Sequence, residues 1–172
     1  VGLAIGEPPA TRGFTPSVFA LLPKLLERAG TAARGSITGL YSVLVEGDDI
    51  NEPITDAVRG IVDGHIVLSR NIAALNIYPA IDVLQSISRV MIDLVDEEHM
   101  HMANYFRSIL ATYEEARDLI DIGAYKEGAN PRIDQAIAVI EQCQAFLRQD
   151  IHEEASFEDT LMLLKNIADR QV

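Results

Sequence analysis

The stretch that decides the fold runs from Gly35 to Arg89 and reads GSITGLYSVLVEGDDINEPITDAVRGIVDGHIVLSRNIAALNIYPAIDVLQSISR. Two segments rich in β-forming residues, Ser36–Glu46 and His65–Ser69, flank an amphipathic stretch that predicts a helix over Glu52–Val62. Both strand segments are apolar on both sides, which is typical of strands buried on both faces of a sheet. The order strand, helix, strand predicts a βαβ unit of a parallel sheet.

The rest of the sequence separates into two regions near residue 93. Residues 1–14 are rich in Gly and Pro and predict a loop, which Thr15 and Pro16 follow as the start of a helix that ends at Gly30. Beyond residue 95, apolar residues recur at steps of three or four and predict helices. These helices are expected over 96–122, from Asn130-Pro131 to about residue 146, and from Ser156 onward. We therefore expect an α/β part over residues 1–93 and an all-α part over residues 94–172.

Composition and charge exclude several classes of protein. The net charge is −12, and residues 96–172 alone hold 16 acidic against 7 basic residues. A nucleic-acid binder needs the opposite sign to meet phosphate, and an acidic membrane surface would repel this half. No apolar run approaches the roughly 20 residues that a membrane span needs. The single cysteine, Cys143, forms no intrachain disulfide and suits a reducing cytoplasm.

No complete catalytic set is found in the sequence. It has no Gly-x-x-x-x-Gly-Lys-Ser/Thr phosphate-binding loop, and its four histidines have no metal-ligand spacing with Cys143. The chain begins at Val1 without an initiator Met or a signal peptide, so we expect an internal fragment whose N-terminal partner has been cut off. An acidic helical interaction module without enzymatic activity remains an open alternative.

Two motifs carry candidate chemistry. Arg89 follows Ser86-Ile87-Ser88, and a guanidinium in such a position can neutralise the charge that builds on a transferred phosphoryl group. By spacing alone, a lone Arg here is more often a surface or structural ion pair. Tyr78 precedes Pro79, which restricts the backbone before it, and a ring held in this way can stack on a nucleotide base. A Tyr that covers the edge of a strand is the alternative.

Together, Tyr78-Pro79-Ala80-Ile81-Asp82 and the Ser-Ile-Ser-Arg run ending at Arg89 resemble the rotary-ATPase-like family. This family includes the F1 β subunit and the type III secretion ATPases of flagella and injectisomes. The resemblance implies the C-terminal part of a RecA-like nucleotide-binding domain over residues 1–93, followed by a helical C-terminal domain. It also implies that Tyr78 and Pro79 pack on adenine and that Arg89 is an arginine finger acting on the neighbouring subunit's nucleotide. Ile151 aligns with the position where the F1 β subunit supplies a second aromatic wall.

Two loops resemble family elements that face the central stalk. The loop over residues 6–13 (GEPPATRG) is similar to the sleeve around the stalk tip, and the turn over residues 46–49 (EGDD) is similar to the acidic catch loop. Ordinary solvated loops are the alternative in both cases. The resemblance implies partner-binding roles for Glu7, Arg12, Glu46, Asp48 and Asp49.

Residues 121–125 (DIGAY) and 126–134 (KEGANPRID) resemble the flagellar type III export ATPases, with an injectisome ATPase or an F1 β subunit as alternatives. The implied full-length protein is a homohexamer that hydrolyses ATP with Mg²⁺ at the cytoplasmic side of the inner-membrane export apparatus. The implied partners are a coiled-coil central stalk protein, an export regulator and export gate proteins, with no nucleic acid. Without a phosphate-binding loop, we expect the fragment alone to be inactive and to bind no nucleotide tightly.

Overall fold

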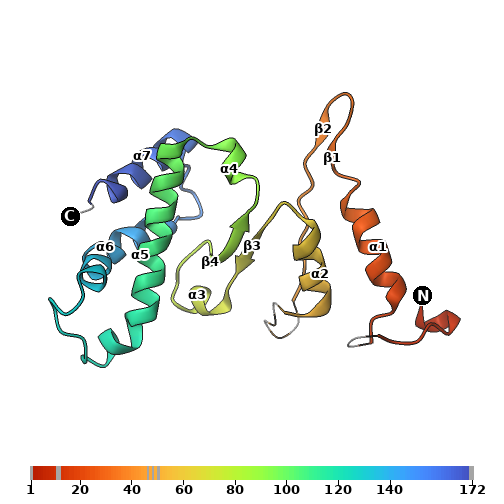
Figure 1. The fold of residues 1–172 in the computed structure, drawn as a ribbon, viewed down its shortest axis with the longest axis horizontal. Coiled ribbons are helices and arrows are strands. Elements are labelled where there is room, and N and C mark those ends of the chain that lie inside the picture. The colour runs from red at the N-terminus through yellow and green to blue at the C-terminus, as the bar shows by residue number, and fades with distance from the viewer. Residues whose placement is uncertain (1, 11–12, 46, 48, 50, 171–172) are drawn as a thin grey trace. The chain divides into compact units, whose positions relative to one another are not determined.

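The structure, a computed structural model, describes residues 2–10, 13–45, 47, 49 and 51–170. The chain divides into two compact units, residues 1–65 and residues 66–172, whose helices and strands are labelled in Figure 1.

The first unit consists mainly of two packed helices. Helix α1 begins after Thr15 with Pro16 in its first turn, as the sequence predicts, and packs against helix α2. A short antiparallel pair, β1 and β2, follows α1, with Gly30 opposite Ile37 and Thr31 opposite Ser36. The elements of this unit are η1 (Leu3–Ile5), α1 (Pro16–Leu26), β1 (Gly30–Thr31), β2 (Ser36–Ile37) and α2 (Pro53–Ile61).

The prediction of a long strand over Ser36–Glu46 is wrong. Strand β2 ends at Ile37 and residues 38–45 form no strand, while Leu40 and Leu44 are each 95% exposed. A strand is stable only where neighbouring strands satisfy its N–H and C=O groups. Among the described residues, β2 pairs only with the two-residue β1, and the second predicted strand belongs to another sheet. Within the described residues, β2 and β3 (Gly64–Leu68) therefore belong to separate two-stranded sheets.

The second predicted strand does form. Strand β3 covers Gly64–Leu68, within one residue of the expected His65–Ser69, and pairs with β4 (Ile81–Ser88). It is not buried on both faces as expected, because the side chains of Ile66 and Leu68 are each 72% exposed. Sequence periodicity indicated neither β4 nor the short helix α4 (Met91–Leu94).

The helical part of the second unit follows the sequence closely. Helices α5 (Glu97–Asp121), α6 (Pro131–Leu147) and α7 (Phe157–Ala168) form where they are expected, and a short helix α3 (Arg70–Ala74) precedes them. The side chain of Asn130 accepts a hydrogen bond from Arg132 N, and the side chain of Ser156 accepts one from Asp159 N, so both predicted helix starts are confirmed. Gly123 follows α5 with a φ of 68°, which explains why the helix ends there.

Helices α5, α6 and α7 enclose one hydrophobic core. The rings of Phe106 on α5 and Phe146 on α6 meet edge to face, with centroids 5.2 Å apart. Cys143 and Ala136 on α6 are fully buried in the same cluster. The remaining buried members are Met102, Tyr105, Ile109, Val139, Ile140, Leu164, Ile167 and Ala168. This core fixes α5 and, through it, the strand that carries the candidate site.

Candidate functional site

Strand β4 is flanked by candidate residues on both sides. Tyr78 and Pro79 precede its first residue, joined by a cis peptide bond, and Arg89 directly follows its last residue, Ser88. The loop before the strand is tied to β3, since Ser69 N donates to Ala80 O at 2.9 Å. Tyr78 is 53% exposed, and Arg89 is also exposed.

Tyr78 lies beside the segment that follows α6. The backbone N–H of Gln149 donates to the carbonyl oxygen of Tyr78 at 2.8 Å. Gln149 begins a closed turn, in which Glu153 N donates to Asp150 O and Asp150 N donates to the carboxylate of Glu153. Ile151 lies in this turn and is 97% exposed. The structure thus joins two segments 71 residues apart, which between them carry Tyr78, Pro79 and Ile151.

Arg107 was not identified by the sequence reasoning. Its guanidinium, which is half-buried, donates three hydrogen bonds to β4: Nη1 to Val83 O at 2.6 Å, Nη1 to Ser86 O at 3.1 Å, and Nη2 to Leu84 O at 3.2 Å. A signal was available in the sequence. Arg107 lies four residues after Ala103 and three before Leu110, on the edge of the apolar stripe of the predicted helix. A charged residue at such an edge indicates a polar partner outside the helix.

Glu7, proposed from the sequence as a partner-binding residue, makes local contacts at the start of α1. Its carboxylate accepts from Ser17 N at 2.7 Å and from Ser17 Oγ at 2.6 Å. These hydrogen bonds, with the side-chain bond to Ser17 as the main cause, hold the pKa of Glu7 below its usual value, although the group is only half-buried. A carboxylate at this position accepts a hydrogen bond from an N–H of the first helical turn. Its negative charge also interacts favourably with the positive end of the helix dipole.

Of the other predicted partner-binding residues, only Asp49 lies within the described part of the chain. Arg12, Glu46 and Asp48 lie outside it. The carboxylate of Asp49 accepts from Asn51 N at 3.1 Å, and its carbonyl oxygen accepts from Glu52 N at 2.9 Å. Asp49 therefore shapes the turn that leads into α2.

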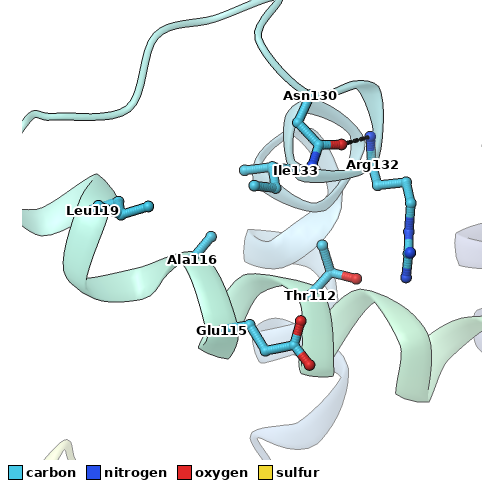
Figure 2. A pocket seen from close by; sticks show the side chains of 7 residues that line it. All are labelled: Thr112, Glu115, Ala116, Leu119, Asn130, Arg132 and Ile133. Atoms are coloured by element: carbon cyan, nitrogen blue, oxygen red, sulfur yellow. Dashed lines mark hydrogen bonds between the residues drawn. The ribbon is translucent and has the colours of Figure 1, made fainter.

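A surface pocket lies between α5 and α6, away from the sequence-predicted residues (Figure 2). Arg132 and Glu115 are among the residues that line it, and Asn130 accepts a hydrogen bond from the backbone N–H of Arg132. Its lining residues are Thr112, Glu115, Ala116, Leu119, Asn130, Arg132 and Ile133. None of the residues predicted to bind a nucleotide or a partner belongs to it.

Among the described residues, no group of three or more His, Cys, Asp or Glu side chains lies together as a metal site would require. None of the described helices is both long enough and apolar enough to span a bilayer.

Family comparisons match both parts of the chain. Residues 1–88 match the ATP synthase alpha/beta family, nucleotide-binding domain, and residues 95–166 match the C-terminal domain of the T3SS EscN ATPase. The division expected between residues 93 and 94 stays a prediction, since the two matches leave residues 89–94 unassigned.

Curated relatives and solved structures agree with these matches. The flagellum-specific ATP synthase of Bacillus subtilis is 53% identical over 97% of this chain and 38% of its own length. A type 3 secretion system ATPase of Sinorhizobium fredii is 56% identical over 94% of this chain and 36% of its own length. The chain thus spans less than two fifths of these relatives.

Among solved structures, the assembled ATPase EscN from enteropathogenic E. coli in complex with its central stalk EscO superposes with a TM-score of 0.84. It is 46% identical, over 97% of this chain and 40% of that one. The chain therefore belongs to the ATP synthase alpha/beta family and corresponds to the C-terminal portion of its flagellar and type III secretion ATPases, part of the nucleotide-binding domain followed by the helical C-terminal domain.

Proposed function

We propose that the full-length protein hydrolyses ATP to energise flagellar type III protein export, with this chain supplying part of the nucleotide site. The observation that carries the proposal is the hydrogen bond between Gln149 and Tyr78. It joins the motif that precedes β4 to the helical domain, in a chain whose residues 1–88 match a nucleotide-binding domain. An isolated helical interaction module would have no need of this arrangement.

Arg89 is proposed to act on a nucleotide held by the neighbouring subunit. Negative charge builds on the γ-phosphate oxygens during transfer, and a planar guanidinium pairs with such oxygens better than an ammonium group does. The position of Arg89 directly after β4, exposed rather than packed in the core, supports a role at a subunit boundary. Bound Mg²⁺ would supply further neutralisation of phosphate charge.

Tyr78 and Pro79 are proposed to form one wall of the adenine site, with Ile151 as the second wall. An aromatic face stacks on a base without regard to its hydrogen-bonding edge. Tyr78 is half exposed and Ile151 almost fully exposed, so both side chains have room for a ligand. An aliphatic second wall buries part of the base but contributes no aromatic stacking.

Replacing Tyr78 by Ala in the full-length protein should weaken ATP binding by about 1–3 kcal/mol, the usual loss for one base-stacking ring. Tyr78→Phe should bind nearly as tightly as the wild type, because the ring face provides the contact. Dissociation constants for a fluorescent ATP analogue measure both variants. Phe157→Ala, which removes another exposed aromatic ring at the start of α7, is the matched control and should leave affinity unchanged. Equal losses in the Ala and Phe variants would argue against stacking.

The catalytic part of the proposal is tested by steady-state phosphate release from the full-length protein. We expect turnover of ATP that stops when EDTA removes Mg²⁺. If no phosphate is released above the buffer level under any condition, the acidic helical interaction module is favoured instead.

The partners are proposed by analogy with the EscN complex, which contains an assembled ATPase and a central stalk. We propose a homohexamer whose stalk-facing loops include Glu7, Arg12, Glu46, Asp48 and Asp49. The carboxylates of this set, repeated around the ring, would attract a basic coiled-coil stalk. An export regulator and export gate proteins at the inner membrane complete the proposed set of partners. Glu7 is the weakest candidate for contact with the stalk, because its carboxylate already accepts hydrogen bonds from Ser17 at the start of α1.

An injectisome ATPase is the second candidate function. The flagellar relative and the type 3 secretion relative are 53% and 56% identical to this chain, so identity does not separate them. The residues 121–134 that resemble the flagellar form support the first candidate. Complementation of export in a flagellar ATPase deletion strain, compared with an injectisome deletion strain, distinguishes the two.

A further inference from the structure

Side chains donate hydrogen bonds to several backbone carbonyl oxygens of β4. The carbonyl oxygens of Val83, Leu84 and Ser86 accept from the single guanidinium of Arg107. The hydroxyl of Ser86 donates to the carbonyl oxygen of Asp82 at 2.6 Å, and Ser86 Oγ accepts from Val67 N on β3 at 3.0 Å. Normal ladder hydrogen bonds join backbone to backbone. The position of β4 therefore depends on Arg107 as well as on its neighbouring strand.

The guanidinium of Arg107 is itself held in place by the helical core. Its neighbour Phe106 and the nearby Ile109 are each only 4% exposed and belong to the cluster that α5 shares with α6 and α7. A planar guanidinium with three donated hydrogen bonds has little freedom to move. Arg107 thus links α5 of the helical core directly to the backbone of β4.

We propose that Arg107 is a positioning residue that holds β4, and with it Arg89, at the place where the arginine finger acts. This inference rests on the proposed role of Arg89. Arg89 lies three residues beyond Ser86, a span of about 10 Å along an extended chain. Loss of the three hydrogen bonds would let the end of the strand shift, and a displacement of about 1 Å at a reacting group lowers rates by about a hundredfold.

Replacing Arg107 in the full-length protein tests the inference. Arg107→Met, which keeps the length of the side chain without its donors, should lower kcat for ATP by about 10- to 100-fold and leave KM and the ATP dissociation constant within about threefold. Arg107→Lys should also lower kcat, since one ammonium group cannot span three carbonyl oxygens in the geometry of the fork. The matched control is Arg117 on the same helix, whose exposed side chain pairs with Glu114 and Asp121. Arg117→Met should leave kcat unchanged.

A second arm separates positioning from general damage to the fold. In an Arg89→Ala background, adding Arg107→Met should change kcat by less than about threefold, because the group that it positions is already absent. A full 10- to 100-fold additional loss in that background would overturn the inference, and so would wild-type kcat in Arg107→Met when Arg89→Ala alone is impaired. If Arg89→Ala retains wild-type turnover, it is the proposed role of Arg89 that fails.

Amide hydrogen exchange tests, independently of turnover, whether Arg107 holds β4 in place. The amides of residues 81–89 should exchange at least about tenfold faster in Arg107→Lys than in the wild type, while those of α6 stay unchanged. Unchanged exchange in β4 would overturn the inference whatever the kinetics show. Arg107→Lys is used for this measurement because it keeps the positive charge and most of the packing. It is therefore expected to fold even if Arg107→Met does not.

Discussion

Arg89→Ala in the full-length protein is expected to lower kcat for ATP hydrolysis by about 10³- to 10⁵-fold, the range found for arginine fingers in other NTPases. ATP affinity should change by no more than a few fold, because the guanidinium meets charge that develops only in the transition state. Phosphate release and equilibrium nucleotide binding, measured on the same preparation, give the two quantities. Arg132→Ala, which removes an exposed Arg from the first turn of α6, is the matched control and should retain turnover.

The same variant also tests whether Arg89 acts between subunits. If the finger reaches a neighbour's nucleotide, mixing Arg89→Ala subunits with subunits disabled in nucleotide binding should restore some active sites. Turnover in the mixture should then exceed the sum of the two separate preparations. A wild-type rate in Arg89→Ala would instead assign this residue to a structural ion pair.

The thiol of Cys143 should be almost inert in the folded protein. The side chain is fully buried in the α5–α6–α7 core, and burial raises the pKa of the thiol from its usual value of 9.0 to about 11. At pH 8 the pKa shift alone lowers the thiolate fraction, and with it the rate of alkylation, by about a hundredfold, and exclusion of the reagent lowers it further. Mass spectrometry of the peptide containing Cys143, after timed exposure to iodoacetamide with and without urea, measures both rates. Comparable rates in the two conditions would show that this core is open.

The same pKa shift predicts how stability depends on pH. Because the folded-state pKa lies above that of the unfolded chain, the neutral thiol stabilises the fold fully below about pH 9, and this contribution is lost as the pH rises toward 11. Urea unfolding at pH 7.5 and pH 10.5 should therefore show a larger alkaline loss in the wild type than in Cys143→Ala. Parallel losses in the two proteins would remove Cys143 from the alkaline transition.

The helices of this chain could be predicted from the sequence because their hydrogen bonds are local. Asn130 and Ser156 accept from backbone groups two and three residues ahead, and Gly123 provides the left-handed turn that ends α5. The apolar stripe of α5 likewise depends only on spacing along one helix. The motifs over residues 78–82 and 86–89 were also sufficient to indicate the family that the comparisons show.

The tertiary structure determined how far the strands extend and which groups the site residues contact. Apolar composition predicted a strand up to residue 46, but β2 ends at Ile37, since hydrogen-bonding neighbours, rather than composition, determine how far a strand extends. Sequence spacing gave no reason to join Tyr78 to Gln149, or Arg107 to carbonyl groups more than 20 residues away. The sequence by itself determined the helices and the motif residues, whose geometry is local. Only the tertiary structure decided which backbone groups those residues meet, because such contacts join parts of the chain that packing alone brings together.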